Sequence, residues 1–273
     1  MGDEVRDFYN RYGEREWYRL EEDACSRITF ALHMNFIKPH LREGIKTLDA
    51  GCGAGRYSVE FARMGCDVTL FDISDEQLRI AKTKLAERDL ERQVSGYIQG
   101  DIRDLSVFPD QSFDVVVCYG APLNYVLEGR EQAISEFHRV LKDGGILALS
   151  ANSKWGSFKS ILGRNIKGFF DRSGYWYIDS IITSGDWPKH EKVDHPPRHF
   201  FEARELRELL ESAQFRDIVL GASPCILHGS RLQAVEICRD ETAYQTLLDI
   251  ELRVYQKPSM VDSGEYLMAK GRK

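Results

Sequence analysis

The chain has 273 residues, of which 42% are hydrophobic and 29% charged, and its formal net charge is −6. This is an ordinary globular composition, with enough residues for one substantial core and an inserted segment. The negative charge does not favour an electrostatic nucleic-acid binder. No apolar run approaches the roughly 20 residues that span a bilayer, and the charged segment Met1–Asn10 lacks the apolar stretch of a signal peptide. We therefore expect a cytoplasmic protein that does not contact membranes.

The first part of the chain, from about residue 4 to residue 41, is predicted to be helical. Apolar and aromatic side chains recur there at helical spacing, and Pro39 and Gly44 end the pattern. We expect residues 1–44 to form an N-terminal helical cap and residues 45–273 to form the main domain. The aromatic residues of the cap are expected to pack against the sheet or to close over a ligand. They are Tyr9, Tyr12 and Trp17.

Between residues 45 and 150, short apolar runs alternate with amphipathic segments. The predicted strands are Ile45–Ala50, Asp67–Phe71, Tyr97–Gln99, Phe113–Cys118 and Ile146–Ser150. The predicted helices are Arg56–Met64, the segment from Ser74 through Arg88, and Arg130–Leu141. Strands that alternate with helices in this way predict parallel βαβ units with right-handed crossovers.

The regular alternation stops after Ser150. The segment of about 152–200 is rich in aromatic residues and is predicted to be either a cap over a pocket or an oligomer contact. Its aromatic residues are Trp155, Phe158, Phe169, Phe170, Tyr175, Trp176, Tyr177 and Trp187. Regular elements then return, as the helix Ala203–Ser212, the strand Phe215–Leu220, a helix of roughly Glu241–Val254 and the strand Glu265–Ala269.

Together these elements predict an α/β fold with a doubly wound, mostly parallel sheet of seven strands. The last strand is expected to be antiparallel and to lie at an edge of the sheet, and the helical and aromatic segments are expected to form a cap. The cap would combine the N-terminal helices, the inserted segment 152–200 and the helix near 241–254. We expect a monomer or a homodimer.

Cysteine and histidine spacing does not favour a disulfide framework or a metal site. The six cysteines contain no C-x-x-C pair. His190, His195 and His199 lie among prolines at spacings that match no helical metal-binding pair, so no metal is expected. One of these three histidines could instead act as a general base, because imidazole titrates near neutral pH. His33 and His138 are expected on helix surfaces or interfaces.

The decisive segment is Thr47–Gly55, in which a predicted strand runs into three alternate glycines. Glycines suit a site where the backbone turns sharply and a ligand approaches the main chain. Three carboxylates, Asp49, Asp72 and Asp101, follow at the ends of successive predicted strands. Asp72 could accept hydrogen bonds from ribose hydroxyls, and Asp101 could reach the amino group of a heterocycle.

Other interpretations of this segment remain. A dinucleotide-binding loop has the pattern G-x-G-x-x-G, but here Gly51, Gly53 and Gly55 are two residues apart and Arg56 occupies the position of the third glycine. Asp49 could anchor the loop amides, whereas Asp72 could cap a helix and Asp101 could simply end a strand. Arg56 is expected either in solvent or in the pocket.

The segment Leu48–Gly55 resembles the L-D-x-G-C-G-x-G signature of the class I S-adenosylmethionine-dependent methyltransferases and matches it at every fixed position. Gly100-Asp101, Phe113–Val116 and Arg139–Gly145 are similar to further motifs of that family. Tyr12–Trp17 resembles the leader of its small-molecule branch in bacteria and archaea. The resemblance is firm over about 45–151 and weaker near 199–220.

The resemblance implies a Rossmann-like catalytic domain that binds S-adenosylmethionine and transfers its methyl group in line to a small-molecule acceptor, leaving S-adenosylhomocysteine. It implies that Asp49 lies near the ammonium group, Asp72 at the ribose hydroxyls and Asp101 at the adenine amino group. The implied cofactor-binding residues are Asp49, Gly51, Cys52, Gly53, Gly55, Asp72, Ile73, Asp101, Ile102 and Tyr119.

The acceptor is less well defined by the sequence. Tyr119–Asn124 would border the sulfonium and the acceptor, and the candidates for a catalytic role are Tyr119, Asn124 and His199. Two alternative functions remain open, an RNA base methyltransferase and a non-catalytic S-adenosylmethionine-binding protein. The acidic charge and the absence of an appended RNA-binding module favour a small molecule over nucleic acid.

Overall fold

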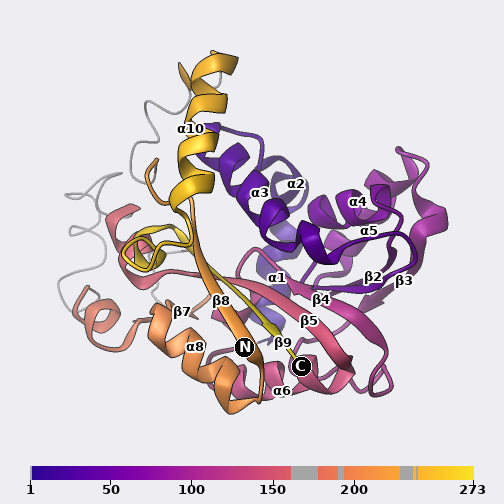
Figure 1. Ribbon diagram of the computed structural model, residues 1–273. Coiled ribbons are helices and arrows are strands. Elements are labelled where there is room, and N and C mark those ends of the chain that lie inside the picture. Colours follow the sequence, from indigo (N-terminus) through magenta and orange to yellow (C-terminus); the bar gives the residue numbers. More distant parts are fainter. Residues whose placement is uncertain (1, 161–177, 190–193, 228–235, 238) are drawn as a thin grey trace.

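The computed structural model describes residues 2–160, 178–189, 194–227, 236–237 and 239–273 (Figure 1). Its helices are α1 (Gly2–Tyr12), α2 (Arg15–Tyr18), α3 (Ala24–Ile37), α4 (Arg56–Arg63), α5 (Asp75–Ala86), α6 (Arg130–Val140), α8 (Ala203–Ser212) and α10 (Glu241–Val254). Its strands are β1 (Lys46–Ala50), β2 (Asp67–Asp72), β3 (Val94–Gln99), β4 (Phe113–Cys118), β5 (Leu141–Asn152), β6 (Asp186–Trp187), β7 (Arg198–His199), β8 (Arg216–Ser223) and β9 (Tyr266–Arg272). Some residues considered above lie outside the described ranges, namely Phe169, Phe170, Tyr175, Trp176, Tyr177, His190 and Cys238.

The predicted doubly wound sheet is confirmed. Seven strands follow the order β3-β2-β1-β4-β5-β9-β8, in which β9 runs opposite to the other six strands. The predicted edge position of the last strand is wrong, because β9 pairs with both β5 and β8. Leu267–Ala269 of β9 are fully buried, which suits a strand with a neighbour on each side. Arg216 and Asp217 of β8 are exposed, which suits a strand at the edge of the sheet.

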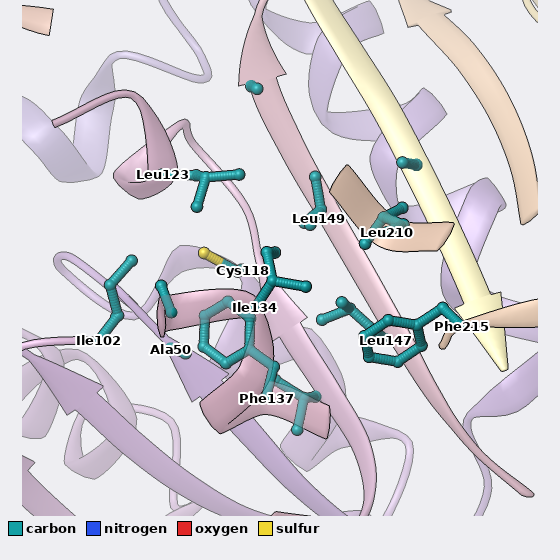
Figure 2. Close-up of a cluster of buried hydrophobic side chains, with 14 of the residues drawn as sticks. Ala50, Ile102, Cys118, Leu123, Ile134, Phe137, Leu147, Leu149, Leu210 and Phe215 are labelled. Atoms are coloured by element: carbon teal, nitrogen blue, oxygen red, sulfur yellow. The ribbon is translucent and has the colours of Figure 1, made fainter. Parts of the chain in front are cut away.

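Two apolar layers enclose the sheet. On one face, α6 and α8 cover a core that includes Phe137, Leu147 and Leu210 (Figures 1 and 2). On the other face, α3, α4 and α5 cover a second core, in which Phe61 and Leu70 pack together. Valines 115 to 117 of β4 are buried alternately in the two cores, which explains why this segment forms a central strand.

The N-terminal segment, predicted to be helical, forms the three α-helices α1, α2 and α3. Gly13 has a left-handed φ of 58° at the end of α1. The side chain of Asp23 accepts a hydrogen bond from the Ser26 amide and begins α3. The apolar periodicity continues across both interruptions, so it predicted the helical content but not the breaks. The resulting bends let α1 and α2 fold back over the end of the sheet.

Strand β5 is longer at both ends than its apolar run suggests. The segment 142–145 lies between the predicted helix Arg130–Leu141 and the predicted strand Ile146–Ser150, but it already belongs to the strand. Leu141 of β5 pairs with Phe113 of β4. The pairing of these strands then changes register between Phe113 and Val115, and this irregularity accommodates the two glycines of β5. Long-range pairing therefore overrides the turn-forming composition of this segment.

The inserted segment contributes the small antiparallel pair β6 and β7. Helix α10 packs against α3 and projects from the body of the molecule (Figure 1). Among the described residues, no helix has the length and apolar character needed to cross a membrane.

Candidate cofactor site

A cleft of about 910 Å³, part of it open to solvent, lies at the carboxyl ends of β1, β2 and β4. This is the point where the strand order reverses, because β2 and β4 flank β1. Ligands of open α/β sheets bind at such switch points. All the cofactor-binding residues implied by the sequence line the cleft except Gly55. Helices α1 and α2 supply the further lining residues Gly2, Val5, Tyr9 and Glu16, and Arg19, directly after α2, also lines the cleft.

The glycine loop follows β1 and requires glycine for two reasons. Gly51, Gly53 and Gly55 all have left-handed φ angles, between 51° and 78°. A Cβ at Gly51 would also lie 2.3 Å from Pro122, and one at Gly55 would lie 2.9 Å from Ala81. Backbone conformation and packing therefore require these glycines, in addition to the close ligand approach expected from the sequence.

Most amides of this loop already donate hydrogen bonds within the protein. The Gly51 and Cys52 amides both donate to the Phe71 carbonyl, at 2.7 and 3.1 Å. The Gly53 amide donates to Asp72 at 2.8 Å, and the Gly55 amide donates to the Cys52 carbonyl at 3.0 Å. A loop that holds phosphate needs free amide donors. This loop is consequently unsuited to a pyrophosphate.

Asp72 ends β2 and lies buried beside the loop. Its Oδ2 accepts the Gly53 amide and its Oδ1 accepts the Ser74 amide, each at 2.8 Å. Burial raises the pKa of the Asp72 carboxyl to about 6, against the opposing effect of these two bonds. Ser74, not Asp72, is the N-cap of α5. Each Asp72 oxygen keeps a lone pair, so the carboxylate can still accept bonds from two ligand hydroxyls.

Asp49 lies at the end of β1 and is almost fully buried. Its Oδ2 accepts a 2.5 Å hydrogen bond from the Ser58 hydroxyl of α4. Burial raises the pKa of the Asp49 carboxyl to about 7, although the Ser58 bonds oppose this shift. The carboxylate is thus destabilised by desolvation, and a nearby cationic ligand would stabilise its ionised form.

The raised pKa predicts a pH-dependent stability. Below about pH 4 Asp49 is protonated in both states, whereas between pH 4 and 7 only the unfolded chain loses the proton, so stability falls through this range. We expect Asp49→Asn to raise the free energy of unfolding by about 2–4 kcal/mol at pH 8 and by little at pH 4. Urea unfolding across this range measures the difference. The exposed Asp143→Asn is the control, and a pH-independent difference would contradict the explanation.

Asp101 follows β3 at the far end of the cleft and pairs with Arg103. The guanidinium contacts both carboxylate oxygens, with Nε 2.9 Å from Oδ1 and Nη2 2.5 Å from Oδ2. Burial opposes ionisation, but the Arg103 bonds outweigh it and keep the pKa of Asp101 below its ordinary value. The carboxylate is therefore ionised and oriented. Its Oδ1 also accepts the Arg103 amide at 2.9 Å, so Oδ2 is the oxygen that retains acceptor capacity.

The sequence did not single out Glu16 and Arg19 of the N-terminal cap. Arg19 Nε donates to Glu16 Oε1 at 2.6 Å, and Glu16 lies over Gly53. The Nη2 of Arg19 would lie 2.8 Å from a Cβ at Gly120, so the absence of a side chain there makes room for the guanidinium. The sequence feature that could have pointed to these residues was the charged Tyr12–Trp17 leader. Its position beside the glycine loop, however, follows only from the fold.

The three catalytic candidates have their polar groups engaged elsewhere. The Tyr119 hydroxyl donates to the His33 carbonyl at 3.2 Å. Asn124 donates to the His199 carbonyl and accepts the Asn152 amide at 3.0 Å. Although Tyr119 lines the cleft, Asn124 and His199 do not. Asn124 therefore joins the end of β5 to β7 and has no free group for catalysis.

His199 is held between carboxylates of two other segments. Its Nδ1 lies 2.7 Å from Asp186 Oδ1 and its Nε2 lies 2.8 Å from Glu205 Oε1. Arg130 also donates to Glu205. Neither ring nitrogen is free to accept a proton from the cleft. The expectation that His199 acts in catalysis is therefore not retained, and its position indicates that it joins β7 to α8.

Other expectations need correction. Of the two positions expected for His33, a helix surface is wrong, because the ring is buried against Tyr57 and Tyr119, where burial lowers its pKa to about 4. The described residues of the segment 152–200 do not line the cleft, and neither does α10. Arg56 does line it, but pairs with Glu21 and Glu60. Among the residues that the structure describes, the N-terminal helices therefore form the immediate cover of the cleft.

The fold and the cleft define a doubly wound α/β protein whose switch point carries a glycine loop and buried carboxylates. Comparison with known proteins makes this more specific, since residues 48–149 match the family described as "Methyltransferase domain". Over this segment the chain is similar to S-adenosylmethionine-dependent methyltransferases, as the glycine loop suggested.

Two relatives show how far the sequence likeness extends. A protein from Geobacillus sp. (strain WCH70), which carries the name of a methyltransferase, is 34% identical over 174 residues, covering 62% of each chain. The ubiquinone/menaquinone biosynthesis C-methyltransferase of Psychromonas ingrahamii is 28% identical over 181 residues, covering 64% of this chain and 68% of its own. The first alignment spans less than two thirds of that relative's length.

Solved structures extend the likeness to the fold. A possible histamine N-methyltransferase from Thermotoga maritima is 20% identical, with a TM-score of 0.60 and complete coverage of both chains. The 1,6-didemethyltoxoflavin-N1-methyltransferase of Burkholderia thailandensis is 17% identical, with a TM-score of 0.61 and coverage of 99% of this chain and 88% of its own. At these identities the likeness concerns the fold.

Proposed function

We propose that this protein transfers a methyl group from S-adenosylmethionine to a small-molecule acceptor. The observation that carries the proposal is the pairing of a glycine loop whose amides are already occupied with the carboxylates of Asp49 and Asp72 beside it. Such a site is suited to a cationic nucleoside rather than to a phosphate-bearing dinucleotide.

The adenosyl part fits the end of the cleft nearest β2 and β3. Asp72 would accept the two ribose hydroxyls with its remaining lone pairs. Asp101, held in place by Arg103, would accept the adenine amino group. Ile73 and Ile102 line the same part of the cleft and offer apolar surface to a heterocycle.

The amino-acid part needs partners for a carboxylate and an ammonium group. Among the described lining residues, the cations are Arg19, Arg56 and Arg103. Arg103 is held by Asp101, and Arg56 pairs with two glutamates. Arg19 is described with a single ion-pair partner, Glu16, through Nε, and its Nη2 lies over Gly120. We assign Arg19 to the ligand carboxylate and Asp49 to the ammonium group.

The chemistry divides between the cofactor and the chain. When bound, S-adenosylmethionine supplies a methyl group that its sulfonium already makes electrophilic. The chain has to orient the acceptor and exclude water, and correct orientation can be worth roughly 7–11 kcal/mol. Helices α1 and α2 cover the cleft and are fixed to α5 through Gln77, whose side chain donates to the carbonyls of Tyr9 and Gly13. This connection supports a preformed, covered site.

The names of similar proteins favour a small acceptor over a nucleic acid. One relative is named for ubiquinone and menaquinone biosynthesis, and one structural neighbour is described with bound 1,6-didemethyltoxoflavin and S-adenosylhomocysteine. The net charge of −6 points the same way. That the protein works as a monomer or a homodimer remains a prediction.

The proposal is tested by incubating the protein with methyl-labelled S-adenosylmethionine and a small-molecule extract, then measuring S-adenosylhomocysteine. We expect product and a labelled small molecule. Methylation that disappears when the extract is treated with ribonuclease would replace the small acceptor with RNA. Binding without turnover across several extracts would instead favour a non-catalytic cofactor-binding protein.

A further inference from the structure

Three aromatic side chains connect the cleft to the inserted segment. Tyr9 and Tyr125 line the cleft, and their hydroxyls are 3.3 Å apart. The Tyr125 hydroxyl is also 3.4 Å from Nε2 of His195, which lies outside the cleft lining. The rings of Tyr125 and His195 are nearly parallel, with centroids 5.7 Å apart. Residues from α1, the β4–α6 connection and the insert thus meet in one hydrogen-bonded chain.

The direction of proton donation along these hydrogen bonds follows from the second hydrogen bond of His195. His195 Nδ1 lies 3.0 Å from the Pro196 carbonyl, which can only accept. Nδ1 therefore carries the proton and Nε2 has the lone pair. The Tyr125 hydroxyl donates to Nε2, and its oxygen accepts from the Tyr9 hydroxyl. Both bonds, at 3.3 and 3.4 Å, are longer than is usual for hydroxyl donors.

The surroundings of His195 keep it neutral. Burial, together with the charges of Arg198 and Lys189, lowers its pKa to about 4, whereas Asp194 and the bond to Pro196 oppose the shift. Asp194 is itself paired with Arg11 of α1. The ring of Phe8, with its centroid 4.8 Å away, covers another side. At neutral pH the lone pair of Nε2 is therefore available.

We propose that Tyr125, supported by His195, accepts the proton of an acceptor whose reacting atom is a hydroxyl oxygen or an amine nitrogen. This inference rests on the proposed function and adds the chemical class of the acceptor. In the transfer, the new bond joins the methyl carbon to that oxygen or nitrogen, and the bond to sulfur breaks with both electrons left on sulfur. The acceptor proton passes to the Tyr125 oxygen as the hydroxyl proton of Tyr125 passes to Nε2.

Other groups in the described part of the chain are less suited to this role. Both ring nitrogens of His199 face carboxylates, and the Tyr119 hydroxyl is bound to a main-chain carbonyl. His33 Nε2 is without a partner, but it is fully buried and has no access to the cleft. Tyr125 is the hydroxyl that both lines the cleft and contacts a neutral imidazole.

The first test measures methyl transfer to four probes, catechol, histamine, β-mercaptoethanol and acetylacetone. We expect product with catechol or histamine only. With that probe, Tyr125→Phe and His195→Gln should each lower kcat by about 100-fold, the typical contribution of general acid–base catalysis. The dissociation constant for S-adenosylmethionine, measured by calorimetry, should stay within about twofold, because both variants leave the carboxylates and Arg19 in place. Tyr18→Phe and His138→Gln, outside the cleft, should retain full activity.

The outcomes separate this inference from the proposed function. If wild-type protein binds S-adenosylmethionine but methylates none of the four probes and nothing in a small-molecule extract, the proposed function fails, and the inference fails with it. If methylation occurs but is confined to the thiol or carbon acid, the acceptor class is wrong. Unchanged kcat in both variants would remove Tyr125 and His195 from the mechanism.

A second test does not depend on turnover. Nuclear magnetic resonance of protein with 15N-labelled histidine should show His195 as the neutral Nδ1–H tautomer at pH 7, with protonation only near pH 4. Tyr125→Phe should shift the Nε2 resonance, because that nitrogen loses its hydrogen-bond donor. An Nε2–H tautomer, a protonated ring at pH 7 or an unmoved resonance would overturn the inference whatever the activity measurements show.

Discussion

Replacing Asp72 by alanine is expected to weaken S-adenosylmethionine binding by about 1.5–3 kcal/mol, or about 10- to 150-fold in Kd, because hydrogen bonds to a charged partner are lost. The effect has two parts. The ribose hydroxyls lose their acceptor, and the Gly53 and Ser74 amides lose theirs. Calorimetry at pH 8, where Asp72 is ionised, measures the loss directly.

The variant Asp72→Asn separates the two parts. Its amide oxygen can accept only on one side, and its NH2 group opposes the other backbone donor. We expect an intermediate loss of affinity, with thermal stability closer to that of the wild type. For the wild type, affinity should fall as the pH drops below about 6, because a protonated Asp72 accepts hydrogen bonds less well. Unchanged affinity in Asp72→Ala would refute the ribose assignment.

The second large effect is expected at Arg19. Arg19→Met keeps much of the apolar stem but removes the guanidinium, and should weaken S-adenosylmethionine binding by about 1.5–3 kcal/mol. The decisive comparison uses decarboxylated S-adenosylmethionine, which lacks the proposed partner of Arg19. Wild type and Arg19→Met should bind this analogue equally well, within about twofold.

The control for Arg19 is Arg79→Met, an exposed arginine of α5 that also pairs with a glutamate three residues away. It should bind both ligands like the wild type. If Arg19→Met loses affinity for the decarboxylated analogue as well, the guanidinium supports the site through Glu16 rather than through the ligand carboxylate. If it loses affinity for neither ligand, the assignment of Arg19 is wrong.

Much of the fold could be predicted because its elements have strong local signals. The strand Phe113–Cys118 and the helices Ala203–Ser212 and Glu241–Val254 have the predicted bounds. Their β-branched runs and helical periodicity are local properties of the chain. The position of β9 was not predictable in this way, because strand order depends on pairing between residues far apart in the sequence.

The site likewise divides into residues with a local sequence signal and residues placed only by contacts between distant segments. Gly51, Asp49 and Asp72 were recognisable because the loop and the strand ends are close in sequence to the elements that place them. His195 was one of three histidines considered as a general base, but its pairing with Tyr125 and the role of Arg19 were not recognisable, since these contacts form only when the cap and the insert fold onto the sheet. His199 failed as a catalytic candidate because its carboxylate partners come from separate segments.

The central claim is that the cleft at the ends of β1, β2 and β4 recognises an adenosyl sulfonium. Calorimetric titration with S-adenosylmethionine, S-adenosylhomocysteine and oxidised nicotinamide adenine dinucleotide tests it most directly. We predict that the first two bind with one site per chain and that the dinucleotide does not bind. Binding of the dinucleotide, with no binding of the two sulfur compounds, would contradict the assignment of the cleft.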